Sequence, residues 1–269
     1  MVWLQIAKPI NNMRKTIIAG NWKMFKTIPE AIELSNGLKR ELYKLDFDNI
    51  DVVLCPPFTA LSEVSETINE SEIKLGGQNI YWLDEGAFTG EVSGKMLKDA
   101  GCSFVIIGHS ERRQFFSETN ETVNKKLKAA LSNNLTPIVC VGEMLNEREA
   151  GKTFEVLKNH VEGALRDISS EDVLKTVIAY EPVWAIGTGK TATPAQAQEV
   201  HKYIRDLLTK LYDNDVSSSL RIQYGGSVKP DNITELMKQP DVDGALVGGA
   251  SLKVDSFTEI AKKASEVRK

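Results

Sequence analysis

The sequence predicts a single α/β domain folded as a closed (β/α)8 barrel. Eight short runs of apolar, often β-branched residues recur along the chain, and amphipathic segments separate them. The length of 269 residues is close to the roughly 250 residues of a typical barrel of this kind. No Ser/Gly-rich linker or break in composition divides the chain, so we expect one domain.

The eight runs are expected to be strands because they are apolar on both faces, as strands covered on both sides must be. In chain order they are residues 17–20, 52–55, 73–76, 104–108, 137–141, 177–180, 222–224 and 245–247. Between them, apolar residues recur at helical spacing, most clearly within residues 31–42, 123–131, 200–211 and 257–267. Thr27 and Glu30 have the spacing of a capping box. Thr193 and Gln196 repeat it, with Pro194 at the first helical position.

An open, doubly wound sheet is the main alternative for strands that alternate with helices. Such a sheet usually binds a nucleotide at a Gly-rich turn after its first strand. Here that strand ends in Gly20, Asn21, Trp22 and Lys23. This stretch contains no GxGxxG pattern, so the closed barrel is favoured.

Composition places limits on the function. The net charge is −4, so we expect no general attraction to nucleic acid or to an anionic membrane. No apolar run approaches the ~18 residues that a membrane span needs. Cys55, Cys102 and Cys140 are odd in number and form no CxxC pair, which favours reduced, buried thiols in a cytoplasmic protein over disulfides or a thiolate metal site.

The first twelve residues precede Met13, Arg14 and Lys15, which resemble a second chain start. The apolar stretch near the N-terminus is too short and too poorly flanked for a signal peptide. We therefore expect residues 1–12 to be a flexible N-terminal extension and residues 13–269 to form the barrel.

Polar side chains at the C-terminal ends of barrel strands build the active site of such folds. Asn21 and Lys23 follow the first strand, where a lysine can neutralise a substrate anion and an asparagine can donate to an oxygen. Taken alone, this pair is more typical of a turn with a solvated lysine.

His109 directly follows the fourth strand, where a helix is expected to begin. The N–H groups at a helix start disfavour an imidazolium, so we expect a neutral hydrogen-bond donor. A core or capping histidine is the alternative. That alternative is less favoured because His109 is one of only three histidines in the chain and lies at the C-terminal end of its strand, where the active site is expected.

Glu181 closes the sixth strand. A carboxylate there is costly unless it is paired or functional. Partial desolvation is expected to raise its pKa toward the working pH of a base that removes a proton beside a carbonyl. A glutamate turned toward solvent is the alternative.

The loop after Glu181 is expected to be a lid. Residues 189–191 resemble the end of a phosphate-binding P-loop, but Trp184 stands where that motif needs its first glycine. Trp184 and Ile186 instead suit a cover over the site, and glycines such as Gly187 let backbone N–H groups approach a phosphate.

Paired glycines follow the last two strands. They are Gly225 and Gly226, which precede Ser227, and Gly248 with Gly249. The loops after strands seven and eight are the usual phosphate grip of these barrels. A base, a neutral histidine, a lysine and a phosphate cradle suit proton transfer on a phosphorylated carbonyl compound through an enediolate. The sequence contains no metal-ligand cluster or nucleotide fingerprint, so we expect neither metal nor cofactor.

The candidate site residues lie in five stretches of the chain: residues 19–24, 107–113, 179–189, 224–227 and 246–250. In these stretches the chain closely resembles the triosephosphate isomerase family. The resemblance extends from Met13 to the end. It implies the interconversion of dihydroxyacetone phosphate and D-glyceraldehyde 3-phosphate, without cofactor, in the cytoplasmic reactions of glycolysis and gluconeogenesis.

The resemblance also implies roles for individual residues. Glu181 would move the proton between neighbouring carbons, and His109 would polarise and protonate the oxygens. Lys23 would hold substrate charge, Asn21 would help to orient the substrate, and Glu111 resembles the family's carboxylate beside the lysine. The implied phosphate ligands are the backbone N–H groups of Gly187, Ser227, Gly248 and Gly249.

The segment between Gln78 and Gly94 is long for a barrel loop and contains three aromatic residues. These rings could pack on their own barrel. In the family, the corresponding loop reaches into a partner subunit, near the segment around Asn21 and Met24. The resemblance therefore implies a homodimer, with Thr89 near the tip of this loop.

Two other functions stay open at this point. Another phosphosugar isomerase or epimerase on the same barrel would share the phosphate cradle but should not carry this lid sequence. A non-catalytic barrel that only binds a ligand is the second, and intact Glu181, His109 and Lys23 argue against it. An isomerase assay distinguishes the three.

Overall fold

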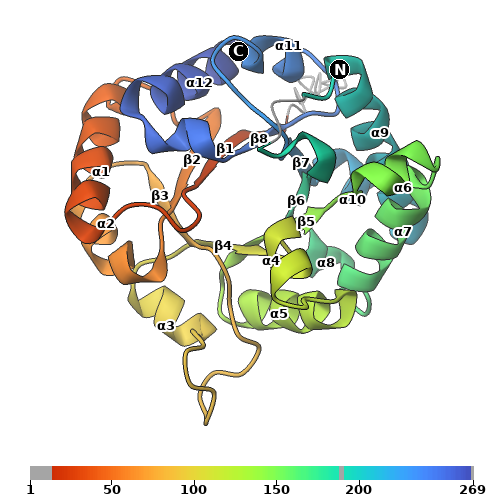
Figure 1. The fold of residues 1–269 in the computed structure, drawn as a ribbon, viewed down its shortest axis with the longest axis horizontal. Helices are drawn as coiled ribbons and strands as arrows, with labels where there is room; N and C mark the ends of the chain where they lie inside the picture. The colour runs from red at the N-terminus through yellow and green to blue at the C-terminus, as the bar shows by residue number, and fades with distance from the viewer. Residues whose placement is uncertain (1–13, 188–190, 268–269) are drawn as a thin grey trace, which may run out of the picture.

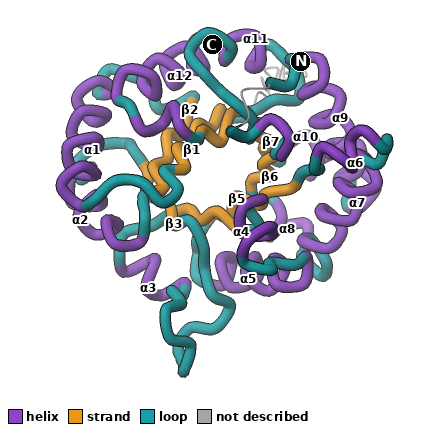
Figure 2. Tube along the Cα trace, viewed as in Figure 1, coloured by secondary structure: helices purple, strands orange, loops and turns teal. Residues whose placement is uncertain are grey.

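The computed structural model describes residues 14–187 and 191–267. Eight parallel strands close into a barrel in chain order, and β1 completes the ring by pairing with both β2 and β8. Helices surround this ring on the outside (Figures 1 and 2). The predicted (β/α)8 fold is confirmed. The predicted extension of residues 1–12 lies outside the described residues.

The strands follow the predicted apolar runs closely. They are β1 (Thr16–Asn21), β2 (Ile50–Cys55), β3 (Lys74–Gly77), β4 (Phe104–Ile107), β5 (Thr136–Val141), β6 (Val177–Tyr180), β7 (Arg221–Tyr224) and β8 (Gly244–Val247). On β1, Ile17 and Ala19 belong to a cluster inside the barrel, whereas Ile18 packs into the layer between strands and helices. This double burial explains why the runs are apolar on both faces.

The helices include several short ones that the apolar spacing did not reveal. They are α1 (Ile28–Leu42), α2 (Leu61–Thr67), α3 (Gly94–Asp99), α4 (Ser110–Phe115), α5 (Asn120–Ser132), α6 (Leu145–Glu149), α7 (Thr153–Ala164), α8 (Ser170–Val173), α9 (Pro194–Leu211), α10 (Asn214–Ser219), α11 (Ile233–Met237) and α12 (Val254–Val267). The capping boxes that begin α1 and α9 are present as predicted. Within the described part of the chain, no helix is both long and apolar enough to cross a membrane.

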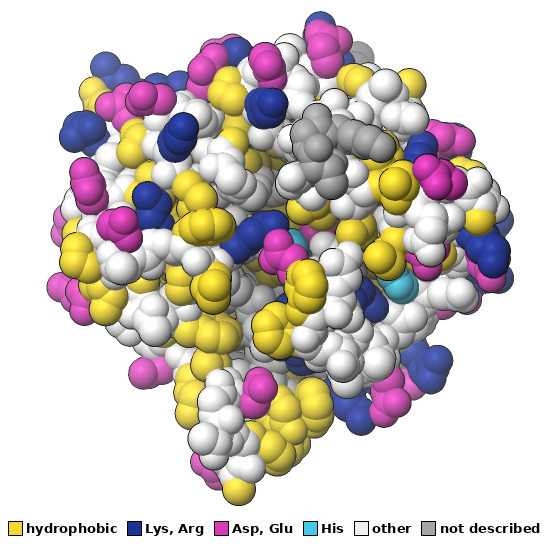
Figure 3. Space-filling view, viewed as in Figure 1, with side chains coloured by type: hydrophobic (Ala, Val, Ile, Leu, Met, Phe, Trp, Pro, Cys, Tyr) yellow, Lys and Arg dark blue, Asp and Glu magenta, His cyan; other side chains and the backbone are white. Residues whose placement is uncertain are grey.

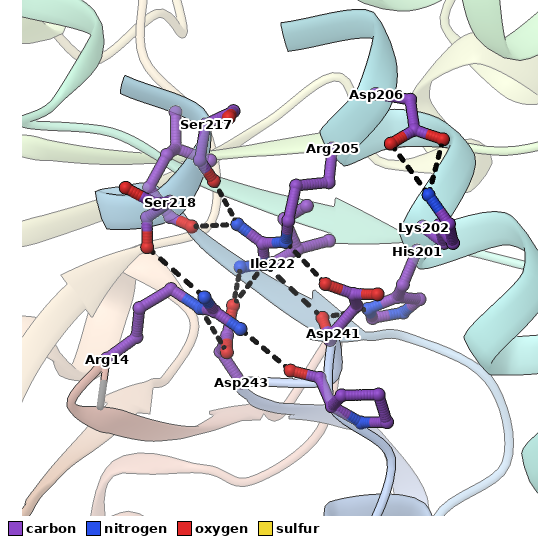
Figure 4. A network of polar contacts seen from close by, with 12 residues as sticks. Arg14, His201, Lys202, Arg205, Asp206, Ser217, Ser218, Ile222, Asp241 and Asp243 are labelled. Atoms are coloured by element: carbon purple, nitrogen blue, oxygen red, sulfur yellow. Dashed lines mark hydrogen bonds and ion pairs between the residues drawn. The ribbon is translucent and has the colours of Figure 1, made fainter. Parts of the chain in front are cut away.

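A buried ionic network closes the barrel at the N-terminal ends of β7 and β8 (Figure 4). Asp243, which precedes β8, accepts from Arg14 Nε at 2.7 Å and from Arg205 Nη2 at 2.9 Å. It also accepts from the backbone N–H of Ile222 in β7 at 2.8 Å. The network links the start of the barrel to α9. It lies at the N-terminal ends of the strands, which contribute to stability in such barrels, whereas the active site forms at the C-terminal ends.

Candidate active site

A cavity of about 480 Å³ opens at the C-terminal ends of the strands. Most of the predicted site residues line it: Asn21, Lys23, His109, Gly187, Ser227, Gly248 and Gly249. Figure 3 shows basic, acidic and histidine side chains gathered near the centre of this face. Its size and mixed polar lining suit a small polar ligand.

Lys23 stands in a turn after β1 that needs support. Its φ of 51° lies in the left-handed region, which is costly for a residue other than glycine. Its N–H donates to Asn21 Oδ1 at 3.0 Å, and its carbonyl accepts from Gln78 Nε2 at 2.9 Å. Its ammonium group contacts the Glu111 carboxylate. The turn therefore presents one fixed, paired cation to the cavity.

His109 caps the start of α4 and is held in one tautomer. Its Nδ1 accepts from the backbone N–H of Glu111 at 3.2 Å, which leaves Nε2 as the nitrogen that carries the proton. That nitrogen lies 2.9 Å from Glu181 Oε1. The geometry therefore makes Nε2 the nitrogen that donates.

The electrostatics of His109 are less simple than the sequence suggested. Burial lowers its pKa, but the Glu181 carboxylate raises it, and the net pKa lies above the ordinary value. A helix start alone does not reveal this partner, because Glu181 is distant from His109 in the chain. The effect depends on the contact with Glu181, so it weakens when the two side chains separate.

Glu181 directly follows β6 and is 2% exposed. Its Oε2 accepts from the backbone N–H of Ser110 at 2.9 Å, while Oε1 has no well-aligned donor among the described residues. Burial raises the pKa of Glu181, but His109, the Ser110 N–H and Lys23 together lower it below the ordinary value. The expected rise in pKa is therefore wrong for this arrangement, because sequence reasoning missed these partners.

This placement of Glu181, against Ser110 and His109, is called the resting position below. Glu181 does not line the substrate-sized cavity. It lines a separate cavity of about 210 Å³, the rear cavity, with Ser110, Arg113, Cys140 and His160. The carboxylate is thus turned away from the place that a substrate would occupy.

The start of the predicted lid is tied to the end of β5. Val183–Ala185 forms a short 3-10 turn. Trp184 Nε1 donates to Glu143 Oε1 at 3.0 Å, and the Val183 N–H donates to the Glu143 carbonyl at 3.1 Å. Glu143 is fully buried and also accepts from the Tyr180 hydroxyl at 3.1 Å. A motion that displaces Val183 or Trp184 must break or rearrange these bonds.

The lid continues through Gly187, whose φ of 70° suits glycine. The next residues, including Gly189, lie outside the described residues. On the opposite wall, Gly249 begins a 3-10 turn, Gly249–Leu252, directly after β8. A Cβ at Gly249 would meet no atom within 4 Å, so the backbone there faces open space. Gly187, Ser227, Gly248 and Gly249 border one cavity, where their N–H groups suit an anion.

Three residues of the site escaped the sequence analysis: Gln78, Ser110 and Glu143. Ser110 directly follows His109 at a helix start, where free N–H groups are expected, so that signal was available. Glu143 follows β5 as Glu181 follows β6, and a carboxylate at the catalytic edge could have been noticed. No local signal distinguishes Gln78.

Comparisons with known proteins agree with this geometry. The family model described as triosephosphate isomerase matches residues 16–264. Proteins named triosephosphate isomerase from Alkaliphilus metalliredigens and Carboxydothermus hydrogenoformans are each 56% identical to this chain, over 248 and 252 residues. One from Endomicrobium trichonymphae is 54% identical over 250 residues. These matches cover 92–93% of this chain and 99% of each relative.

Proposed function

Because the chain belongs to the triosephosphate isomerase family, it interconverts dihydroxyacetone phosphate and D-glyceraldehyde 3-phosphate, and we propose that Glu181 is the base that moves the proton. The observation that carries this assignment is the contact between a buried carboxylate and a tautomerically fixed histidine at the edge of a polar cavity. Burial and a neighbouring donor are what a carboxylate base for carbon acids needs.

The substrate phosphate binds against the glycine-bordered wall of the cavity. Gly187, Ser227, Gly248 and Gly249 border this part of the cavity, and their backbone N–H groups are the donors that would bind the phosphate. Lys23 balances part of the substrate charge, and its pairing with Glu111 keeps the ammonium group in place. Asn21 supports the Lys23 turn and borders the same space.

The reaction follows from this placement. Glu181 takes a proton from the carbon beside the carbonyl, and the electron pair of the broken C–H bond forms the carbon–carbon double bond of an enediolate. The oxygen that gains charge lies against His109, whose Nε2–H stabilises it by hydrogen bonding. His109 then gives its Nε2 proton to that oxygen and takes the hydroxyl proton from the neighbouring oxygen, so that its own protonation is restored. Glu181 returns its proton to the neighbouring carbon as the new carbonyl forms, which gives the other triose phosphate.

Glu181 has to leave the resting position before this step, because there it points into the rear cavity. The lid directly follows Glu181, and the first turn of the lid is hydrogen-bonded to Glu143. Closure of the lid over a bound phosphate is therefore able to carry the carboxylate toward the substrate carbon. The same closure excludes water from the enediolate.

An isomerase assay coupled to a dehydrogenase tests the function directly. The full chain should convert either triose phosphate to the other without any added metal or cofactor. An epimerase on the same barrel would act instead on a ketopentose phosphate, and a binding protein would turn over neither. Glu181→Gln, prepared in parallel, controls for contaminating host isomerase.

A homodimer is part of the proposal. Residues 78–94 project from the barrel beyond α3 (Figures 1 and 2), and hydrophobic side chains gather on this projection (Figure 3). Tyr81 stacks on Trp82 with ring centroids 4.1 Å apart, and Phe88 lies 4.6 Å from Tyr81. Met24, beside Lys23, is 93% exposed. A two-fold pair that docks each projection near the partner's Met24 would cover both apolar surfaces.

The cellular location and the extension complete the proposal. Cys55, Cys102 and Cys140 are free, buried thiols, which supports the reducing cytoplasm. The family match begins at residue 16, which supports residues 1–12 lying outside the catalytic domain. Cell fractionation tests the cytoplasmic location. A chain that starts at Met13 should keep full isomerase activity if residues 1–12 lie outside the catalytic domain.

A further inference from the structure

Arg113 lies on α4 behind the resting base, and its guanidinium group bonds to neutral oxygens. Nε donates to the Gly108 carbonyl at 2.8 Å, Nη1 donates to Asn120 Oδ1 at 2.8 Å, and Nη2 reaches the Cys140 carbonyl at 3.5 Å. Among residues 14–187 and 191–267, no carboxylate lies within ion-pair distance of this partly buried cation. A cation in such a place usually has an acidic partner.

Glu118, an acid near Arg113, is already paired with other cations. Glu118 is buried and accepts from Arg112 Nε at 2.8 Å, and it lies 3.1 Å from Lys126 Nζ. The Glu118 carboxylate therefore pairs with both Arg112 and Lys126. Two other acids, Glu147 and Glu181, line the rear cavity of about 210 Å³ with Arg113. Of these two, Glu181 is the one whose charge raises the pKa of Arg113.

We propose that Arg113 is a positioning residue for the base: its fixed charge, acting from the rear side, adds to the Ser110 N–H and His109 in holding the Glu181 carboxylate ionised in the resting position between turnovers. The inference rests on the assignment of Glu181 as the base. Burial alone would favour the neutral acid, which cannot accept a proton. Glu181 Oε1 lacks a well-aligned donor, so a positive charge on the rear side adds to the stabilisation that the Ser110 N–H and His109 give the ionised carboxylate.

The Glu181 charge favours the charged form of Arg113. Burial lowers the pKa of Arg113, while the negative charges near it, including that of Glu181, raise it. A carboxylate that favours the charged guanidinium is itself favoured as the charged form by the same amount, because the interaction is reciprocal.

The other charged or titratable groups that face Glu181 do not replace this cation. They are His109, Lys23 and Glu111 on the substrate side, and Cys140, His160 and Glu147 around the rear cavity. His109 and Lys23 lower the pKa of Glu181 from the substrate side, where Lys23 is also paired with Glu111. Burial lowers the pKa of His160 to about 4, and burial raises the pKa of the Cys140 thiol, so both are neutral near pH 7. Arg113 is thus the permanent cation on the rear side.

The test is a direct titration of Glu181 by ¹³C NMR, with the glutamate side-chain carboxyls labelled. The Glu181 signal is the one that disappears in Glu181→Gln. Arg113→Gln removes the charge and keeps an amide donor, and Arg113→Lys keeps the charge and loses the planar fork. We expect Arg113→Gln to raise the pKa of Glu181 by at least about half a pH unit, the scale of one partly screened charge. Arg113→Lys should move it by less than half as much.

Arg112→Gln is the matched control, because it removes a charge from the same helix that is already paired with Glu118. It should leave the Glu181 titration close to that of the parent protein. If Arg113→Gln is poorly folded by circular dichroism, Arg113→Met removes the charge while keeping the apolar stem.

Two results would overturn the inference: equal shifts in Arg113→Gln and Arg113→Lys, which indicate a role of shape, or no shift in either charge-removing variant. The assignment of the base fails separately, if Glu181→Gln turns over normally. The NMR titration is unaffected by that outcome, so the two failures are distinguishable.

Discussion

Glu181 and His109 lie in direct contact, with Oε1 2.9 Å from Nε2. A substrate whose carbon faces the base and whose oxygen faces the histidine has to enter between them. The aligned bond that holds Glu181 in place is from the Ser110 N–H, at 2.9 Å. One such bond contributes only about 1–3 kcal/mol, so the carboxylate is held firmly enough to be ordered and loosely enough to move.

Replacing Glu181 with glutamine should remove catalysis and leave the fold intact. The amide oxygen can still accept from the Ser110 N–H, and the side chain keeps its size, but it cannot take a proton from carbon. Turnover should fall by at least about 10²–10⁴-fold, the contribution of a general base. Steady-state assays measure this, with circular dichroism as the check on folding. Near-normal turnover in a folded variant would refute the role of Glu181.

Lys23→Met should mainly weaken substrate binding, because it removes a fixed positive charge from the cavity. A charge-assisted contact contributes about 1.5–3 kcal/mol, so kcat/KM should fall roughly 10–150-fold with a rise in KM. Lys229, an exposed lysine that also borders the cavity, offers a control. If Lys229→Met lowers kcat/KM as much as Lys23→Met, the lysine after β1 has no special role.

The positions of the site residues could be predicted from local sequence, whereas the orientations of their side chains could not. Buried strands and helix starts depend on local composition, and the runs before Asn21, His109 and Glu181 predicted both the barrel and the edge where these side chains lie. The orientation of a side chain at that edge depends on residues distant in the chain. Ser110 holds the Glu181 carboxylate across 71 positions, so no local pattern could show that the base rests facing the rear cavity.

The same limit applied to the supports of the site. Gln78 fixes the Lys23 turn from the third strand, and Glu143 holds Trp184 from the fifth. Each is a polar residue just past a buried strand, and sequence alone does not distinguish such a support from a turn residue. The paired charge of Glu111, by contrast, followed from the family resemblance rather than from any spacing.

The dimer should depend on the projecting loop. Replacing Phe88 with aspartate puts a charge on the apolar cluster with Tyr81 and should shift the protein toward monomers, because a buried unpaired charge is costly. Light scattering at micromolar concentration measures the mass. Tyr43→Asp, on an exposed aromatic of α1's C-terminal end, is the control. A parent protein that is monomeric and fully active at that concentration would contradict the assembly.

His201 should make the folded state less stable in mild acid. It is fully buried on α9, with Nδ1 3.0 Å from the Asp241 carbonyl, and burial lowers its pKa to about 4 from 6.5. Between these values the unfolded chain binds a proton that the folded protein does not. Stability is therefore full above about pH 6.5 and is lost as the pH falls toward 4, by at most about 3 kcal/mol.

Urea unfolding of the parent and of His201→Gln, at pH 7 and at pH 4.5, measures this effect. The variant should lose less stability between the two pH values than the parent, although it starts lower. Some loss should persist, because burial also lowers the pKa of His160 to about 4. Equal losses in both proteins would show that His201 does not contribute.

The lid prediction tests the mechanism most directly. An enediolate phosphate has two fates: it is reprotonated to product, or it expels phosphate irreversibly. Expulsion is favoured when the phosphate can turn into line with the π system and water can reach it. A closed lid opposes both, because the Gly187 N–H holds the phosphate and Ile186 helps to exclude solvent.

Cutting residues 186–189 and rejoining the chain should leave the barrel folded, because a surface loop contributes little to the core. The anchors of the lid's first turn on Glu143 remain, so Glu181 keeps its surroundings. Turnover should fall, and a growing share of the substrate should appear as methylglyoxal and free phosphate, quantified by product analysis beside the parent enzyme. If the shortened protein isomerises slowly but releases no additional phosphate, the lid does not protect the intermediate. In that case the assignment of Glu181 would still stand, because it depends on the first prediction and not on this one.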